Sequence, residues 1–287
     1  MSAAEALDHV GIAGHDLAAL AEKWQRLGFQ LTPFARHSGC RIPDGPVVPF
    51  GTGNRCILLR HGYLELIAIV DPAAFSDKLE TFLARYEGIQ ILALSIADEQ
   101  ATMARLRCAG IDIPGIAYLE RPVDDSDPAG PIARFARLLL PDPVEGRIQL
   151  IRHLTPEAIW QERFLTHPNG AVGLKEVVLA VTNPADTAAR LSRLAGRSVV
   201  PDPVGGFSLE LSSGRVRMVP QDGLETIFPG MVVPCLPFIA GLALHTVDGN
   251  SAATRWFESH GVEYKVIPGA LLVDATQTGG VAMRLEA

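Results

Sequence analysis

The stretch RHGYLELIAI, residues 60–69, decides the fold of this chain. A glycine precedes a short, mostly apolar run, a pattern typical of a turn followed by a β-strand. Successive side chains of a strand point to opposite faces, so Tyr63, Glu65 and Ile67 share one face. An unpaired carboxylate is costly to bury. We therefore expect Glu65 to be paired, to bind a metal or to lie at the edge of a cavity.

This strand closes a unit in which a strand, a helix and further strands follow one another. Residues 7–13 are predicted to form the first strand, and Asp16 to cap a helix over 17–26. A long polar loop is predicted over 36–53, followed by a strand over 55–59 that leads into the stretch above. Such a long loop in a compact domain is usually functional, so we expect a lid or a pocket wall there, or else a plain surface loop.

The same unit recurs three more times along the chain. In each copy a polar residue that starts the helix follows the first strand at the same offset, and a glycine precedes the final strand. The later copies begin with strands over 91–97, 176–182 and 241–247, their helices start at Asp98, Asn183 and Asp248, and their turn glycines are Gly146, Gly214 and Gly280. The sequence therefore predicts an α+β fold of four βαβββ modules.

The segment between the second and third copies contains no such unit. We therefore predict one domain over residues 1–153, a linker over 154–172 and a second domain over 173–287. The first domain contains copies one and two, and the second contains copies three and four.

Composition narrows the possible functions. Hydrophobic residues make up 48% and charged residues 20%, which is typical of a globular protein, and the net charge of −7 argues against a nucleic-acid partner. The four cysteines form no CxxC pair, so we expect free thiols in a reducing cytoplasm. No signal peptide and no membrane-spanning run is recognisable, and there is no GxGxxG, GxSxG, HExxH or nucleotide-binding P-loop motif. We expect a cytoplasmic protein with a small-molecule partner and no membrane partner.

Three segments carry a family resemblance: LDHVGIAGHDL (7–17), GTGNRCILLRHGYLELIAI (51–69) and LTPEAIWQ (154–161). With the repeated βαβββ unit, they resemble the vicinal oxygen chelate superfamily, which includes glyoxalase I, bleomycin-resistance proteins, extradiol dioxygenases and methylmalonyl-CoA epimerase. The first half is most similar to glyoxalase-like domains. The resemblance implies that modules pair into two cup-shaped, glyoxalase-like domains. Homodimers are common in this superfamily, whereas four modules in one chain already supply the pairings, so a monomer and a homodimer both fit the sequence.

The resemblance also implies a divalent metal at the bottom of the cup. Its ligands would come from the start of the first strand and the middle of the last strand of each module. In the first domain these positions hold His9, Glu65, Ile91 and Gln149. An imidazole and a carboxylate suit Zn, Ni, Mn or Fe, an amide oxygen is a weaker ligand, and isoleucine cannot bind a metal. The implied ligands are therefore His9, Glu65 and Gln149, and His153 shares a face with Gln149 if the strand continues.

In the second domain the same positions hold Glu176, Arg217, Gly241 and Met283. Glu176 and Arg217 are expected to form an ion pair. The other two positions offer no charged ligand, so we expect the second domain to be a degenerate structural copy.

Other interpretations of the candidate residues stay open. His9 and Glu65 can also form a direct hydrogen bond between neighbouring strands without a metal, and Glu65 is a candidate general base in either case. Four further residues are candidates for the substrate pocket, although Trp160 also fits simple interdomain packing: His37, Asn54, Arg55 and Trp160.

Three functions follow from the resemblance. The first is a glyoxalase-like lyase or isomerase for a small oxo or hydroxy compound, with a divalent metal as Lewis acid. The second is a metal-free protein that binds a small molecule, as bleomycin-resistance proteins do. The third is an extradiol-type dioxygenase, which needs two histidines and a carboxylate, normally in the C-terminal half. The ligand positions of the second domain hold no histidine, which disfavours the third.

Overall fold

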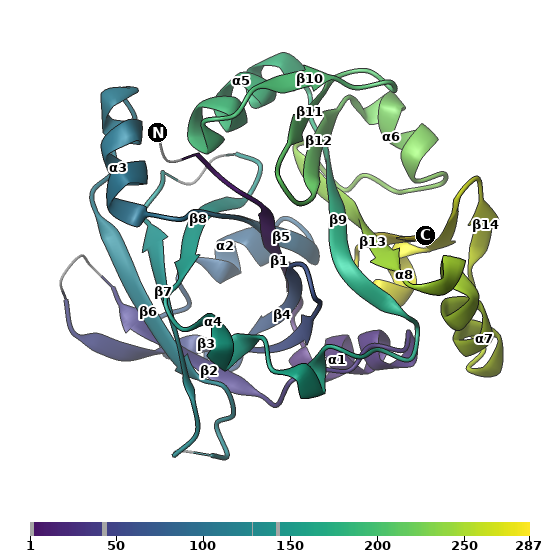
Figure 1. The fold of residues 1–287 in the computed structure, drawn as a ribbon, viewed down its shortest axis with the longest axis horizontal. Helices are drawn as coiled ribbons and strands as arrows, with labels where there is room; N and C mark the ends of the chain where they lie inside the picture. Colours follow the sequence, from purple (N-terminus) through teal and green to yellow (C-terminus); the bar gives the residue numbers. More distant parts are fainter. Residues whose placement is uncertain (1–2, 42–44, 128, 142–143) are drawn as a thin grey trace.

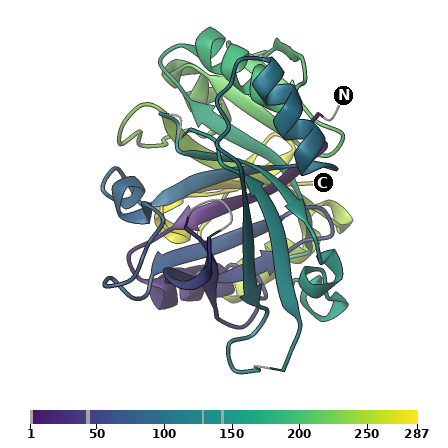
Figure 2. The same cartoon turned by 90° about the vertical axis from the view of Figure 1, so that its left-hand side faces the viewer.

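The computed structural model of the protein describes residues 3–41, 45–127, 129–141 and 144–287. Two sheets lie side by side, and most of the helices lie along their flanks and between them (Figure 1). The strands of the first half close into a barrel in the order β1-β4-β3-β2-β6-β7-β8-β5, whereas the second half forms an eight-stranded sheet in the order β10-β11-β12-β9-β13-β16-β15-β14. In Figure 2 the barrel half faces the viewer. The predicted α+β fold, with one sheet in each half of the chain, is thus confirmed.

The first half contains two modules and a short helix between them. Its elements are β1 (Leu7–Ala13), α1 (Leu17–Arg26), β2 (Ala35–Cys40), β3 (Val47–Leu58), β4 (Tyr63–Ile69), α2 (Leu79–Leu83), β5 (Gly88–Ser95), α3 (Glu99–Cys108), β6 (Ile116–Pro122), β7 (Ile132–Leu138) and β8 (Arg147–His153). Two short helices, α4 (Pro156–Ile159) and η1 (Glu162–Phe164), then lead to the second half.

The second half repeats the pattern with an inserted helix, α6. Its elements are β9 (Ala171–Ala180), α5 (Pro184–Ala195), β10 (Val199–Pro201), β11 (Phe207–Glu210), β12 (Arg215–Val219), α6 (Gln221–Ile227), β13 (Phe238–Thr246), η2 (Asp248–Asn250), α7 (Ser251–Ser259), β14 (Lys265–Ile267), β15 (Ala270–Val273), α8 (Ala275–Thr278) and β16 (Ala282–Glu286). No helix among the described residues is long and apolar enough to cross a membrane.

The predicted helix caps form in three modules. The side chains of Asp16, Asp98 and Asn183 accept hydrogen bonds from backbone N–H groups of the first helical turn. In the fourth module the short helix η2 precedes α7, and Asp248 Oδ1 accepts a bond from the backbone N–H of Ala252 at 3.3 Å. In these three modules the caps therefore set the start of the helix relative to the preceding strand.

Strand pairing places three modules in the predicted register. Gly11 of β1 pairs with Glu65 of β4, and Ala93 of β5 pairs with Gln149 of β8. The pairing of β9 with β12 puts Arg217 at the same position. Glu65, Gln149 and Arg217 therefore occupy equivalent places in their modules, as the turn glycines predict.

The fourth module departs from the predicted register by one residue. Ala243 of β13 pairs with Arg284 of β16, so Arg284 is the equivalent of Glu65, and the prediction of Met283 is wrong. Gly279 and Gly280 both have positive φ, 80° and 98°. In the fourth module, the residue equivalent to Glu65 therefore lies one position further from the turn glycine, Gly280, than it does in the other three modules.

The predicted loop over 36–53 is also different from expectation. Its described residues form the β2–β3 hairpin, in which Ala35 pairs with Asn54 and Ser38 with Pro49. Some of the inward side chains of this hairpin are polar, such as His37 and Thr52, and line a cavity. The alternation of apolar and polar residues that marks an ordinary strand is therefore absent.

One apolar core connects the two halves. Leu64 and Leu66 of β4 pack in the same buried cluster as Val177 and Leu179 of β9. The indole of Trp24 on α1 is fully buried and donates a hydrogen bond to the Thr278 carbonyl of the fourth module at 2.9 Å. One face of β4 thus belongs to the shared core, which leaves the other face, with Glu65, turned into the barrel.

Candidate active site

A cavity of about 90 Å³ lies inside the barrel of the first half. Side chains from all eight barrel strands and from the segment before α2 line it. The four positions that the family pattern designates all belong to its wall: His9, Glu65, Ile91 and Gln149. The four residues that the common register designates therefore line one cavity.

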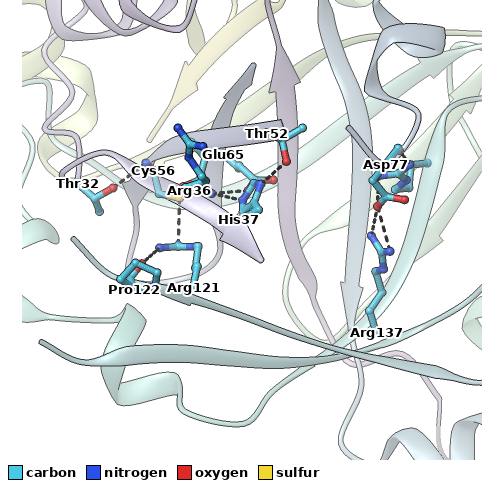
Figure 3. Close-up of polar contacts among 12 residues, drawn as sticks. Thr32, Arg36, His37, Thr52, Cys56, Glu65, Asp77, Arg121, Pro122 and Arg137 are labelled. Atoms are coloured by element: carbon cyan, nitrogen blue, oxygen red, sulfur yellow. Dashed lines mark hydrogen bonds and ion pairs between the residues drawn. The ribbon is translucent and has the colours of Figure 1, made fainter. Parts of the chain in front are cut away.

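Glu65 is held by two neighbours from the β2–β3 hairpin. Asn54 Nδ2 donates a hydrogen bond to Glu65 Oε1 at 2.6 Å, and His37 Nε2 lies 3.1 Å from the same oxygen. His37 Nδ1 lies 2.9 Å from the hydroxyl of Thr52, so the imidazole is fixed on both sides (Figure 3). Burial raises the pKa of Glu65, but the hydrogen bond and charge of His37, the charge of His9 and the Asn54 bond together lower it to about 2. Glu65 is thus an ionised carboxylate at neutral pH.

His9 is positioned by a second buried carboxylate. Its Nδ1 lies 2.6 Å from Asp8 Oδ1, and the Nε2 of His153 lies 3.0 Å from the same oxygen. Burial raises the pKa of Asp8, but the two histidines, His153 above all, more than offset this and hold it well below its usual range. Because the ionised Asp8 accepts the Nδ1 proton, a neutral His9 carries its lone pair on Nε2. The described residues supply no hydrogen-bond partner for that Nε2, and His9 lines the cavity.

Asp8 reaches His9 because the strand is irregular there. Residues next to each other on a regular strand point to opposite faces. The pairing of β1 with β5 shifts between Leu7 and His9, so Asp8 is skipped in the ladder. A bulge of this kind re-aims a side chain, and it brings the Asp8 carboxylate to His9 and His153. Sequence reasoning missed Asp8, although its place directly before His9 was a signal.

Stacking holds the His9 ring as well. Its ring lies 4.4 Å from the ring of Tyr63, at an interplanar angle of 19°. Tyr63 pairs with His9 in the ladder between β1 and β4 and also lines the cavity. Burial raises the pKa of Tyr63 well above its usual value, so its hydroxyl stays protonated. The imidazole is thus fixed by a carboxylate at its edge and an aromatic ring on its face.

Three arginines, all unexpected from the sequence, line the same cavity. Arg137 and Arg147 both donate to the Oδ2 atom of Asp77, at 3.1 and 2.9 Å. Arg121 contacts the thiol of Cys56 at 3.6 Å and the carbonyl of Pro122 at 3.2 Å, as Figure 3 shows. No sequence signal marks these arginines, because they lie on β6, β7 and β8, far along the chain from β1 and β4.

The four predicted pocket residues lie in different places. His37 lines the cavity, and Asn54 lies behind Glu65, which it holds. Arg55 instead donates to the carbonyl of Thr32 at 2.9 Å. Trp160 donates to the carbonyl of Leu59 at 3.0 Å, and its ring packs against Tyr63 and His153. Asn54, Arg55 and Trp160 are therefore supports of the wall rather than parts of it.

The predicted direct bond between His9 and Glu65 does not form among the described hydrogen bonds. His9 contacts Asp8, whereas Glu65 contacts His37 and Asn54. The two groups still interact through space, because the charge of His9 contributes to the low pKa of Glu65. The site is therefore two supported groups that face one cavity.

The donor set fits the implied divalent metal poorly. Ile91 supplies no donor atom, and two neighbours already hydrogen-bond one oxygen of Glu65. Within the described ranges, no three His, Cys, Asp or Glu side chains gather into a group that could hold a metal ion. The ligand set of His9, Glu65 and Gln149 thus stays a prediction, and no chemical step below is assigned to a metal.

The equivalent positions of the second half are filled by ion pairs and an aromatic ring. Glu176 is fully buried and accepts from Arg217 Nη1 at 3.4 Å, as predicted, and from Arg284 Nη2 at 2.8 Å. A side chain at Gly241 would meet the ring of Phe228, whose atoms lie 2.8 Å from the place of its Cβ. Phe228 follows α6 directly and occupies the space over this position. The ring of Phe228 therefore fills this part of the second cup.

Comparisons with known proteins agree with this architecture. A family model described as a glyoxalase-like domain matches residues 7–195. A comparison with curated protein sequences finds no match.

Solved structures share the fold over nearly the whole chain. A hypothetical protein from Staphylococcus aureus superposes with a TM-score of 0.63 at 13% identity, covering 98% of both chains. The Mn(II)-bound glyoxalase from Novosphingobium aromaticivorans gives 0.57 at 14% identity, covering 99% of this chain and 82% of that one. A catechol 2,3-dioxygenase gives 0.52 at 13% identity, covering 99% and 93%. At such identities the likeness concerns the fold alone.

Proposed function

This chain belongs to the glyoxalase-like domain family, within the vicinal oxygen chelate superfamily, and from that premise we propose that it is a lyase or isomerase. Its substrate would be a small oxo or hydroxy compound held in the barrel of the first half. The observation that supports this most strongly is the pairing of two buried, supported ionisable groups, His9 and Glu65, on one cavity. Groups of this kind are costly to bury and concentrate at functional sites.

In this proposal His9 is the general base. Asp8 fixes the tautomer that leaves the lone pair on Nε2, and it stabilises the imidazolium that forms when His9 takes a proton. The carbon next to the carbonyl of an oxo compound is the group that would lose its proton to Nε2, with the electron pair of the C–H bond moving into an enolate. The same histidine can return the proton to a neighbouring atom, which makes the net reaction an isomerisation.

Glu65 would act as a charge rather than as the base. With a pKa of about 2 it binds a proton weakly, so it is a poor general base at neutral pH. Its negative charge would stabilise positive charge that develops in the cavity during the proton transfer. This assignment shifts the base from Glu65 to His9 while keeping both in contact with the substrate.

A second candidate function is metal-free binding of a small molecule. Ile91 occupies a position where the family pattern has a ligand, and other walls of the cavity are apolar, including Phe50, Leu79 and Phe135. A ligand would then be sequestered without reaction. The two functions differ in one observable, the transfer of a proton to or from a bound compound.

Deuterium exchange tests the choice between them. The protein in D₂O is incubated with small 2-oxo and 2-hydroxy compounds, and loss of the carbon-bound proton is followed by NMR. We expect the wild type to catalyse exchange or isomerisation. The rate should fall by at least about 10²-fold in His9→Gln, because a positioned general base typically contributes about 10²–10⁴-fold. His15→Gln, at an exposed histidine, is the matched control and should keep the full rate.

Two further results decide the interpretation. Binding of a compound, seen as a thermal shift, with no exchange of any compound would favour the binding protein. The same preparations, purified without chelators, are analysed for Zn, Ni, Mn and Fe. Metal present in the wild type and lost in both His9→Gln and Glu65→Gln would assign these residues as ligands and overturn the role of His9 as base.

A further inference from the structure

Arg121 differs from the other charged groups of the cavity because it lacks a charged partner. It lies on β6, is 6% exposed and lines the cavity. Its Nη2 lies 3.6 Å from the sulfur of Cys56, and its Nη1 donates to the Pro122 carbonyl at 3.2 Å. No ion pair joins Arg121 to a carboxylate among the residues that the structure describes.

The two partners of Arg121 are neutral. Burial raises the pKa of the Cys56 thiol to about 12, so the sulfur carries no charge at neutral pH. The backbone carbonyl accepts one of the five N–H donors of the guanidinium. Taking a guanidinium out of water costs several kcal/mol unless an anion compensates it. A buried guanidinium without an anionic partner is therefore expected of a residue that binds an anionic ligand.

Nearby carboxylates are engaged elsewhere. Glu65 is bonded by His37 and Asn54. Glu120, the residue before Arg121, pairs with Arg134 at 3.2 Å.

The other two arginines of the cavity have a carboxylate partner. Arg137 and Arg147 both donate to Asp77. Arg121 therefore differs from them in having no carboxylate partner among the described residues, and a ligand with one negative charge would supply one.

The cavity contains both Arg121 and His9. In the closed strand order, β6 and β1 are separated by three strands in either direction, so their backbones lie on opposite sides of the barrel. The guanidinium of Arg121 extends to Cys56 of β3, and both Arg121 and His9 line the cavity. A ligand bound at the guanidinium would therefore share the cavity with His9.

We propose that Arg121 binds the carboxylate of the substrate, so that the site selects small oxo or hydroxy acids. This inference rests on the proposed function and specifies its substrate class. Guanidinium and carboxylate form two parallel hydrogen bonds with a charge on each side. An apolar protein cavity of about 150 Å³ holds benzene, so a cavity of about 90 Å³ suits only a small acid.

Matched ligands and variants test the carboxylate site. Glyoxylate and pyruvate are compared with methyl pyruvate, which lacks the charge, and with inorganic phosphate, by calorimetric titration and thermal shift. We expect the wild type to bind the two acids at least tenfold more tightly than the ester or phosphate. Arg121→Met should weaken acid binding at least tenfold and Arg121→Lys by less, whereas the control Arg152→Met, on the outer side of β8 and paired with Glu99, should bind as the wild type does.

The ligand-free melting temperature separates binding from a structural role. Removing an uncompensated buried charge should leave the melting temperature of Arg121→Met unchanged or higher. A clear decrease in both Arg121 variants would mean that the contacts with Cys56 and Pro122 stabilise the fold, and would overturn the proposal. Equal binding of ester and acid, equal binding of phosphate and acid, or acid binding that is unaffected in Arg121→Met would overturn it as well.

The inference and the proposed function can fail separately. If the acids bind through Arg121 but no proton exchange occurs, the carboxylate site stands and the enzymatic function fails. If the wild type and Arg121→Met exchange protons of neutral ketones equally well, the enzymatic function stands and the carboxylate site fails.

Discussion

At the scale of single residues, the state of Glu65 depends on its neighbours. A buried carboxylate by itself would bind a proton more tightly than in water, because burial disfavours its charge. His37 and Asn54 reverse this by donating to one of its oxygens. The same contacts that keep Glu65 ionised also anchor the β2–β3 hairpin to β4. Acid should therefore weaken the fold through this residue.

Stability should show this as a pH dependence. The pKa of Glu65 in the folded protein, about 2, lies below its ordinary value of 4.5, so the unfolded state binds more protons in this range. The stability that Glu65 contributes is present above about pH 4.5 and is lost as the pH falls toward 2, an effect of up to about 3 kcal/mol. In urea unfolding, Glu65→Gln should be less stable than the wild type at pH 7, and the difference should shrink on acidification.

The exposed Glu22 provides the control. Glu22→Gln should unfold as the wild type does at every pH. A difference between Glu65→Gln and the wild type that stays constant from pH 7 to pH 3 would contradict the assigned charge state of Glu65.

At the scale of elements, the turn before β4 sets the register of the site. Gly62 has φ of +77°, in the left-handed region that favours glycine. Its carbonyl accepts a bond from the backbone N–H of Leu59, which closes the turn. The position of its missing Cβ lies 2.8 Å from the carbonyl oxygen of Asp8. The turn thus packs directly against the residue that orients His9.

A pair of glycine substitutions should separate backbone strain from contact. Gly110 has a similar φ of +74°, but nothing lies within 4 Å of the place of its Cβ. Gly110→Ala should therefore cost only the left-handed penalty of about 1–2 kcal/mol. Gly62→Ala should cost at least about 1 kcal/mol more, because the alanine also displaces Asp8. Chemical unfolding measures both, and equal costs would show that the contact with Asp8 is unimportant.

At the scale of the whole molecule, the two cups differ in what fills their interior. The first cup keeps a cavity with an uncompensated charge, whereas the second contains a fully buried Glu176 with Arg215, Arg217 and Arg284 around it. Phe228, from the segment after α6, covers the remaining space. A shared apolar core joins the cups. The second cup therefore has the features of a structural support.

Removing the central carboxylate should be costly for the fold and neutral for binding. Glu176→Gln would leave the surrounding guanidinium groups without this buried anion, and breaking a buried ion pair from one side typically costs about 3–5 kcal/mol. We expect a decrease of this order in the unfolding free energy. The affinity for pyruvate, measured at a temperature where the variant is folded, should not change. A loss of pyruvate affinity would place a binding site in the second half.

Much of the fold follows from local patterns in the sequence. Alternating residues assign the faces of β4, capping residues start the helices, and turn glycines fix the final strands. These signals act over a few residues, so their spacing is preserved from copy to copy. The common register alone was enough to place His9, Glu65, Ile91 and Gln149 on one wall. The register prediction failed at Met283, because in the fourth module one more residue separates the turn glycine from the position equivalent to Glu65.

The contacts that define the site were decided by the tertiary structure. A bulge turns Asp8 toward His9, and a hairpin that has no hydrophobic alternation brings His37 to Glu65. Closure of the barrel brings Arg121 of β6 into the same cavity as His9. Each of these contacts depends on how strands pair, and pairing between distant segments leaves no local signal in the chain. The sequence by itself therefore determined the modules and the positions that face inward, whereas only the packed barrel decided which charged side chains have partners among the described residues.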